Sequence, residues 1–436
     1  MKNLLTLAVF GIAVTWVPDA LSQAFNDFQK PPHSYYDREP TDPMSQLINA
    51  AEAGEFDFGT ETGLPLVKKM LKALDIPESS QVIVFSQTSL QRSLISSENP
   101  RAMFFNEDTH LAWMPGGKVE VISFDPQTGG RFYFEEPPKN PGEKVGFVQP
   151  RSCFGCHGGS ATNFLPGPLA RSHYTAKNGR RVRAVADHIR LGHTVPFESR
   201  WGGYFVTNAP ANLEHLGNTF ASREGQSVVL EQPEGSLSDL SAFFDEKILP
   251  RGDSNVISLL LFDHQIEAHN LLMEALYRHR HLEAETAKSE DGPRERTVRG
   301  TERLFDKLVR YLLFADEVSL EGYDFERNPE FESDFQRNSR KASDGTSLKD
   351  FNLEDRIFEN RLSYLIYSRS FEEAPQEMKD RVYSRLWDIL TPATPPEGFD
   401  YFDPGERARI VKILQETKDD LPAIWRGEAG IVSSDR

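Results

Sequence analysis

The amino-acid sequence predicts an α+β protein, mainly α, with an N-terminal antiparallel β-meander, an irregular middle segment and a helical C-terminal domain. Three observations lead to this fold class. Short runs of β-branched and aromatic residues alternate with turn signals between residues 81 and 136, as in a meander of paired strands. The segment 254–285 carries apolar residues at helical spacing over its whole length. Between these regions, from 153 to 218, glycine, histidine and arginine are frequent and no period is visible, which indicates irregular backbone.

The N-terminus has the layout of a secretory signal peptide. Lys2 precedes an uncharged, mainly apolar run over residues 4–17, and Pro18 ends that run. Small residues suited to cleavage follow at Ala20, Ser22 and Ala24. Because the apolar run is shorter than the ~20 residues that a helix needs to cross a bilayer, we expect residues 1–24 to be cleaved, with an uncleaved anchor as the alternative. The mature chain is therefore expected to be periplasmic or secreted, without a stable membrane span.

The elements of the first third follow in order. Two short helices are expected ahead of the strands, at 43–53 and 63–77, because their apolar residues recur on one face. Five strands are then expected at 81–87, 102–106, 109–114, 118–124 and 131–136. Proline and glycine at 115–117 and 125–130 mark the tight connections of an antiparallel meander.

Helices are expected to dominate the second half of the chain. The predicted helices cover 254–285, 295–317, 354–370, 375–391 and 404–417. The charged stretch 319–348 has few apolar residues and is predicted to be a loop. We expect four parts along the chain: a signal peptide (1–24), an N-terminal α/β-meander region (25–145), a middle segment (146–220) and a helical C-terminal domain (221–436).

The charge of the chain narrows the range of partners. The 436 residues include 66 acidic and 49 basic side chains, which gives a formal net charge of −17. A surface of this sign repels the phosphates of nucleic acid, so no nucleic-acid partner is expected. A basic partner protein remains compatible with this charge.

Both cysteines of the chain lie in one pentapeptide, Cys153-Phe154-Gly155-Cys156-His157. A disulfide between residues three apart would close a trivial loop and constrain almost nothing. Cys-x-x-Cys-His is instead the attachment pattern of c-type haem: each sulfur forms a thioether with one vinyl group, and the adjacent histidine is the proximal ligand of the iron. The sequence therefore predicts one covalent haem c in the segment 146–220. Export agrees with this prediction, because haem c is assembled on the far side of the membrane.

Three other interpretations of the cysteine pair remain open. Thioredoxin-like redox chemistry also uses Cys-x-x-Cys, but usually at the start of a helix in a βαβ unit, unlike the glycine- and proline-rich surroundings here. A zinc site would need two further ligands, for which His173 and His188 are candidates. The third interpretation is a chance occurrence of the pattern without a cofactor.

The second axial ligand of the iron is expected to be a histidine or to be absent. Many small monohaem cytochromes use a methionine some tens of residues downstream, but no methionine follows the motif until Met273. Four histidines lie nearer: His173, His188, His193 and His215. His193 is the first candidate for the distal ligand because it begins the glycine-rich, aromatic segment 193–208, and His173 is the second. Arg200 is the candidate partner of a haem propionate.

Several segments of the chain together resemble a known family. They are VFSQTSLQR, NPRAMFFNEDTHLAWMPGGKVEVISFDPQTGGRFYF, CFGCH, HTVPFESRWGGYFVTN, HLGN, FDHQIEAHN and LIYSRSFEEAPQEMKDRVYSRLWDIL. In these segments the chain is similar to exported bacterial monohaem c-type cytochrome-domain proteins, over most of its length after the signal peptide. The resemblance implies covalent haem at Cys153 and Cys156 and iron ligation by His157. It implies neither a distal ligand nor a substrate.

The expected function is electron transfer through the haem iron, with a redox partner protein that the sequence does not identify. A carrier of one electron needs a single small domain, whereas roughly 410 residues remain after cleavage. The first alternative is therefore a haem c-dependent oxidoreductase, peroxidase-like, with an open iron site. The second is a haem-based sensor or a subunit of a larger redox complex.

Overall fold

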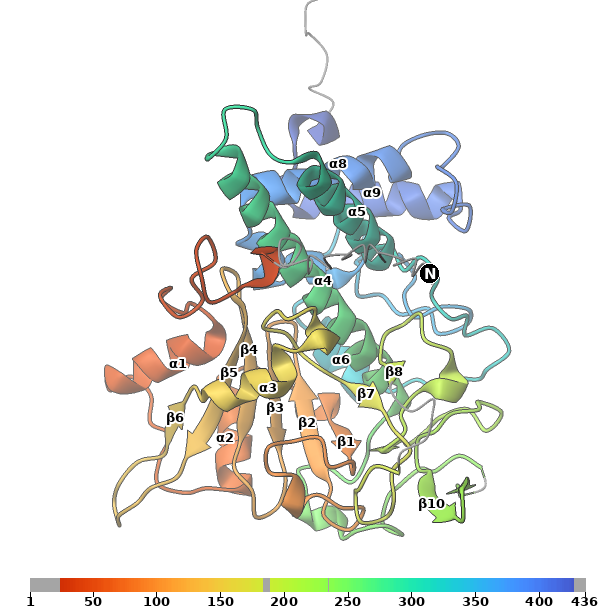
Figure 1. Ribbon diagram of the computed structural model, residues 1–436. Helices are drawn as coiled ribbons and strands as arrows, with labels where there is room; N and C mark the ends of the chain where they lie inside the picture. Colours follow the sequence, from red (N-terminus) through yellow and green to blue (C-terminus); the bar gives the residue numbers. More distant parts are fainter. Residues whose placement is uncertain (1–23, 183–188, 234, 427–436) are drawn as a thin grey trace, which may run out of the picture.

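The computed structural model describes residues 24–182, 189–233 and 235–426, so nearly all of the expected signal peptide lies outside the described residues. The helices are α1 Pro43–Glu52, α2 Leu64–Ala73, α3 Phe154–His157, α4 Val256–Thr286, α5 Glu295–Leu312, α6 Pro329–Gln336, α7 Arg369–Glu372, α8 Gln376–Leu390 and α9 Pro404–Thr417 (Figure 1). The strands are β1 Val82–Val84, β2 Arg101–Phe105, β3 Thr109–Trp113, β4 Glu120–Asp125, β5 Gly129–Glu136, β6 Gly146–Val148, β7 Arg171–Ser172, β8 Ile189–Arg190, β9 Tyr204–Phe205, β10 Phe220–Glu224 and β11 Ser227–Glu231. This arrangement confirms the predicted α+β class.

A seven-stranded antiparallel sheet forms the N-terminal half of the molecule. Its order is β6-β5-β4-β3-β2-β1-β9, so the predicted meander from β1 to β5 is confirmed and the sheet gains one strand at each edge. The turn between β4 and β5 is closed by Asp125, whose Oδ1 accepts the backbone N–H of Thr128 at 2.8 Å. Gly129 follows with φ 77°, in the left-handed region that glycine adopts without a steric penalty.

The two faces of the sheet bury different parts of the chain, because successive side chains of a strand point to opposite faces. Ile83 and Phe104 belong to the core shared with α1 and α2. Their neighbours Val82 and Phe105 belong to the core shared with α4 and the C-terminal helices. The sheet is therefore covered on both sides.

Helix α4 is the central element of the fold. Asn255 caps its N-terminus by accepting the N–H of Ile257 at 2.9 Å. Most of its 31 residues are buried, and Figure 1 shows it running obliquely between the sheet and the C-terminal helices. Gln265 of α4 bonds to His110 of β3, with 3.0 Å between Oε1 and Nε2. The His110–Gln265 contact and the pairing of β1 with β9 join parts of the chain that lie on different sides of the domain boundaries expected at residues 145 and 220.

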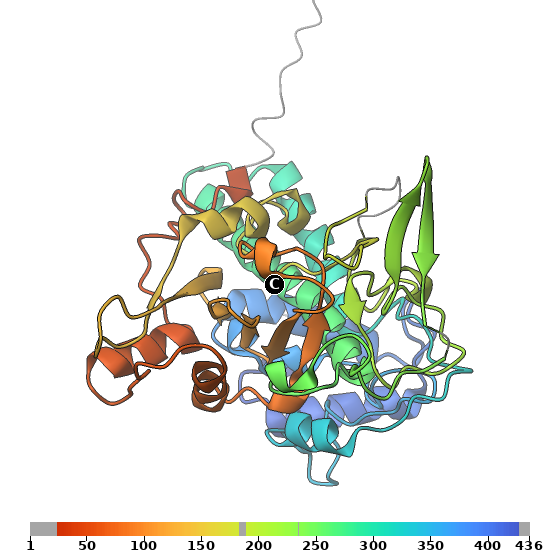
Figure 2. The ribbon, with the colours of Figure 1, turned by 90° about the horizontal axis from the view of Figure 1, so that it is seen from below.

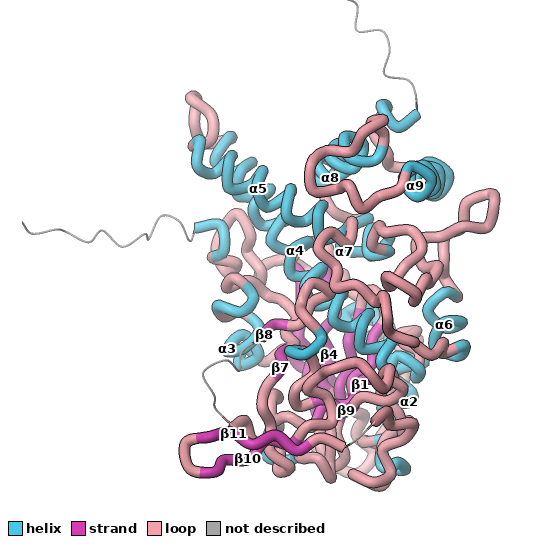
Figure 3. Tube along the Cα trace, turned by 90° about the vertical axis from the view of Figure 1, so that its right-hand side faces the viewer, coloured by secondary structure: helices cyan, strands magenta, loops and turns pink. Residues whose placement is uncertain are grey.

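The C-terminal helices form a layer at the far side of α4. Helix α5 contacts α4 and α8, and α9 contacts α8. Figure 3 shows the β10–β11 hairpin at the opposite end of the molecule from these helices, and Figure 2, seen from below, shows it extending to one side. Among the described residues, no helix combines the length and the apolar composition that a membrane span requires.

Two predictions of secondary structure in this half were wrong. The segment 354–370 is not a helix: its only helical turn is the 3-10 turn Tyr364–Tyr367, and α7 begins just before its end. The expected loop 319–348 contains α6, which Asn328 caps and which buries Phe331 and Phe335. Burial of a few aromatic residues outweighed the polar composition of that segment.

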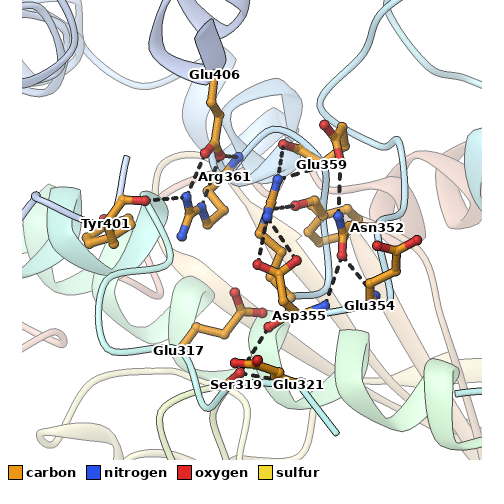
Figure 4. A network of polar contacts seen from close by, with 12 residues as sticks. Glu317, Ser319, Glu321, Asn352, Glu354, Asp355, Glu359, Arg361, Tyr401 and Glu406 are labelled. Atoms are coloured by element: carbon orange, nitrogen blue, oxygen red, sulfur yellow. Dashed lines mark hydrogen bonds and ion pairs between the residues drawn. The ribbon is translucent and has the colours of Figure 1, made fainter. Parts of the chain in front are cut away.

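A polar network holds the long connections of the C-terminal half together (Figure 4). Arg361 donates to Glu406, with 2.6 Å between Nη2 and Oε2, and also to the backbone carbonyl of Tyr401. Glu317 lies in the same region and accepts the backbone N–H of Ile357 at 3.1 Å. Burial raises the pKa of Glu317 to about 8, against the smaller opposing effects of the Ile357 hydrogen bond and Arg361.

Replacing Glu317 by Gln is expected to change the pH dependence of stability. Since the pKa of Glu317 is higher in the folded state than the ordinary 4.5, its favourable contribution is complete below pH 4.5 and is lost as the pH rises to about 8. Glu317→Gln keeps an acceptor for Ile357 and has no charge to bury. We expect the variant to be more stable than the parent at pH 9, by on the order of 2 kcal/mol, and equally stable at pH 4.

Urea unfolding at both pH values measures this difference. Glu321→Gln, at an exposed carboxylate of the same segment, is the control and should leave both midpoints unchanged. An equal effect of Glu317→Gln at pH 4 and pH 9 would contradict the assignment.

Candidate functional site

The Cys-x-x-Cys-His motif forms one compact helical turn on the surface. The 3-10 turn Arg151–Cys153 runs directly into α3, Phe154–His157. Cys153 is half-buried, Cys156 is exposed, and both are free thiols. Residues three and four apart on a helix share a face, so both sulfurs and the imidazole of His157 lie on the same side of this turn.

The orientation of His157 is fixed by a glycine ten residues later. Its Nδ1 lies 2.9 Å from the carbonyl oxygen of Gly167, and the N–H of Gly167 donates to the carbonyl of His157 at 3.0 Å. A carbonyl only accepts, so Nδ1 carries the proton and Nε2 keeps its lone pair. Burial lowers the pKa of His157, which favours the neutral ring. A neutral imidazole anchored through Nδ1–H is the usual state of a histidine metal ligand.

Aromatic side chains support the motif from behind. The ring of Phe154 lies 5.0 Å from that of Phe28 and 5.3 Å from that of Tyr35, in an edge-to-face arrangement with the latter. Phe132 of β5 contacts both Phe154 and His157, with ring centroids 5.3 and 4.8 Å apart. This cluster ties α3 to the sheet and to the N-terminal segment, so the motif has a rigid base.

Charged groups from three strands surround the motif. Burial, with the nearby carboxylate of Glu120, raises the pKa of the Cys153 thiol to about 11, so the thiol stays protonated. Arg171 of β7 lies close enough to Cys156 to be acted on electrostatically by it, although burial lowers the pKa of Arg171 overall. Arg101 lies 3.4 Å from Glu120 through Nη1, and its buried Nε has no hydrogen-bond partner among the described residues. Arg101 and Arg171 are cationic groups close to His157, and Arg151 lies in the first turn of the motif itself.

Two exposed apolar side chains, Tyr36 and Phe164, lie beside the motif. Tyr36 contacts Phe154, and the N–H of Phe164 donates to the carbonyl of Gly159, just after the motif. The loop that carries Leu90 and Leu94 reaches Glu120 through Ser89 and Gln91. Two thiols, a histidine with a free Nε2, apolar cover and arginines together fit a haem.

The structure does not bring His193, the first candidate for the distal ligand, into contact with the motif. His193 is 1% exposed, and its Nδ1 lies 2.8 Å from Nδ1 of His264 on α4. His264 in turn contacts Ser363, with 2.7 Å between Nε2 and Oγ. The ring of Tyr311 stacks on His193 at 4.0 Å. This histidine pair is part of the core between α4 and α5, so the expectation for His193 gains no support.

The side chains of Arg200 and His173 are also buried in the interior of the protein. The guanidinium of Arg200 is 1% exposed and lies 3.5 Å from Asp263 through Nη1, which gives no support to a role with a surface propionate. His173 is 5% exposed, and its backbone N–H donates to the carbonyl of Gly202 at 2.9 Å. Along the chain, His173 lies two positions after Arg171 and is closer to the motif than His193. His188 lies outside the described residues.

Sequence reasoning missed Gly167, Arg101, Glu120 and Arg171 as neighbours of the motif. Only Gly167 could have been identified from the sequence as a neighbour of the motif, because it lies between two prolines in the turn 165–168, soon after His157. The other three come from β2, β4 and β7: β2 and β4 both pair with β3 in the large sheet, whereas β7 belongs to a separate two-stranded sheet, so only the tertiary fold brings them near the motif.

Replacing Gly167 by Ala is expected to disturb the anchor of His157. A Cβ at this position would collide with Oδ1 of Asn270 and lie 2.9 Å from Cε of Met273, both on the buried side of α4. Overpacking of this kind costs about 1–3 kcal/mol. Urea unfolding measures the loss, and the reduction potential of the haem-loaded protein reports the displacement of His157.

Gly155→Ala is the matched control for this prediction. Gly155 lies inside the motif, but nothing lies within 4 Å of an added Cβ. It should change neither stability nor potential by a measurable amount, and an equal effect of both substitutions would contradict the role of Gly167.

Comparisons of the chain with models of protein families, with curated proteins and with solved structures gave no match. The functional argument therefore rests on the residues of the site.

Proposed function

We propose that the protein is an exported monohaem c-type protein that transfers electrons through a haem bound to Cys153, Cys156 and His157. The observation that carries the proposal is the hydrogen bond from Nδ1 of His157 to Gly167, at 2.9 Å, which leaves Nε2 available for a metal. The pattern Cys-x-x-Cys-His and the signal-like N-terminus support the same conclusion from the sequence.

Each residue of the site has a distinct task in this proposal. Cys153 and Cys156 would hold the haem through two thioethers, each formed by addition of a thiol S–H across one vinyl group, with the hydrogen passing to the other vinyl carbon. His157 ligates the iron, and Gly167 holds its ring in one orientation. A bound haem supplies one-electron chemistry at its iron. The aromatic base around Phe154 keeps the attachment turn rigid and excludes water from its inner side.

An oxidoreductase or sensor with an open iron is the second candidate. The observation that favours it is that His193 pairs with His264 and Arg200 with Asp263 inside the core. Neither side chain is then available to a haem at the motif, so in this alternative His157 would be the protein ligand of the iron and the haem would supply a site for a small molecule.

Optical spectra of the purified protein, made in a bacterium that attaches haem c, test both candidates. Covalent haem that stays with the chain on a denaturing gel is expected. A low-spin spectrum that carbon monoxide leaves unchanged supports electron transfer, whereas a high-spin spectrum that shifts with carbon monoxide supports the open site. A purified chain without covalent haem would refute both.

A further inference from the structure

A second cluster of potential ligand atoms lies near the C-terminal end of α4, beyond the residues of that helix that pack close to the Cys-x-x-Cys-His motif. Near the C-terminal end of this helix, His279 and Glu283 approach Glu377 in the first turn of α8. The helices α4 and α8 contact each other, and Figure 1 shows them meeting at the upper side of the molecule. One nitrogen of His279 and one oxygen of each carboxylate all lie within 4.8 Å of one another.

His279 is the unusual member of the cluster. Its side chain is only 2% exposed, and neither ring nitrogen has a hydrogen-bond partner among the described residues. A buried polar group without a partner costs free energy, and most such groups in folded proteins are satisfied by protein, water or an ion. Burial also lowers the pKa of His279, so the ring is neutral and offers a lone pair.

The two carboxylates lie beside this ring, and Glu283 is also close enough to Arg280 to act on it electrostatically. Glu283 lies one turn after His279, and its Oε1 is 3.4 Å from Nε2. No other ion pair or hydrogen bond of the Glu283 or Glu377 side chains occurs within the described ranges. Ligand atoms at ~2.1 Å from a tetrahedral zinc ion lie ~3.4 Å apart, which matches the distance between the histidine and Glu283.

The two arginines near His279 already form contacts with other residues. Arg381 and Arg280 are the positive groups close enough to act on His279. Arg381 pairs with Glu302 at 2.5 Å, and Arg280 donates to the backbone carbonyl of Gln127 at 3.0 Å. Neither arginine forms an ion pair with Glu283 or Glu377 among the described residues.

We propose that His279, Glu283 and Glu377 bind a divalent transition-metal ion of the zinc class, with water as the fourth ligand. A nitrogen ligand favours zinc over magnesium and calcium, which prefer oxygen ligands alone. The ion links the end of α4 to the start of α8 and satisfies the buried ring. This site does not depend on the haem, and the proposal stands or falls separately from the proposed function.

The same helix provides an internal comparison. His281 and Glu285 have the same spacing, with 3.2 Å between Nε2 and Oε1. There, however, Arg294 takes the carboxylate of Glu285, and no carboxylate from a second helix completes a cluster among the described residues. The pair at 281 and 285 is therefore not expected to bind the ion.

Calorimetric titration of the chelator-treated, full mature protein with zinc chloride tests the proposal. One equivalent of zinc should bind, and Glu377→Gln, at an exposed position that folding does not require, should weaken binding at least tenfold. His281→Gln should bind as tightly as the parent. His279→Gln should lose binding, with circular dichroism confirming that the variant is folded.

Thermal unfolding gives an independent measurement, because a ligand that binds only the folded state raises the midpoint. Zinc should raise the midpoint of the parent and of His281→Gln, but not that of Glu377→Gln. Zinc binding of equal strength in Glu377→Gln and the parent would overturn the proposal. Calcium or magnesium binding as tight as that of zinc would overturn the assigned class of metal.

Discussion

The double variant Cys153→Ser/Cys156→Ser is expected to lose all covalently bound haem. Serine oxygens do not form the thioethers, and the chain has no other cysteine to replace them. Both thiols are free on one helical turn beside His157, so the substitutions remove the two attachment atoms with little change in shape. Haem staining of a denaturing gel should fall to background, and the mass of the intact chain should drop by one haem.

Single variants sharpen this result. Each of Cys153→Ser and Cys156→Ser keeps one thioether and should retain part of the stain. Ser152→Ala, in the same turn and exposed, is the control and should retain all of it. A double variant that still carries haem on the denaturing gel would refute attachment at this motif.

Asp263→Ala is expected to cause the largest loss of stability, about 3–5 kcal/mol, because it leaves the buried charge of Arg200 without its counter-ion. Asp263 is 0% exposed, lies 3.5 Å from Nη1 of Arg200 and accepts the indole N–H of Trp201 at 3.0 Å. Burial raises the pKa of Asp263 to about 7, against the opposing effect of Arg200, so the measurement belongs at pH 8, where the carboxyl is ionised. The free energy of unfolding in urea is the quantity to compare.

Two further variants compare the contribution of a buried ion pair to stability with that of an exposed ion pair. Removing both charges in Arg200→Met/Asp263→Leu should recover most of the loss, since an apolar pair needs no counter-ion. Glu295→Ala breaks an exposed ion pair with Arg299, 2.7 Å long, and should cost no more than about 0.5 kcal/mol. Equal losses in Asp263→Ala and Glu295→Ala would contradict the burial argument.

The double variant Arg200→Met/Asp263→Leu also tests the prediction that Arg200 binds a haem propionate. Because Arg200 is inside the core, folded Arg200→Met/Asp263→Leu should keep the visible spectrum and the reduction potential of the parent. A large change in potential would instead place Arg200 at the haem.

Local patterns predicted much of the fold, and the proposed chemistry of the Cys-x-x-Cys-His site also rests on a local pattern. Strand alternation and turn residues are short-range properties, so β1 to β5 followed from the sequence. The chemistry of Cys153, Cys156 and His157 also depends on spacing within one turn of the chain. The prediction of a helix at 354–370 was wrong because apolar spacing alone does not distinguish a helix from irregular backbone packed in the core.

Tertiary structure alone decided the rest. β9 joins β1 across 120 residues of sequence, and the carbonyl of Gly167 selects the tautomer of His157. The segment of His193 looked suited to a cofactor, but it meets α4 and buries that ring against His264. The sequence by itself determined which residues form the Cys-x-x-Cys-His motif. Only packing decided which polar groups face the motif and which satisfy each other in the core, because a hydrogen bond or ion pair depends on distances that the order of residues does not contain.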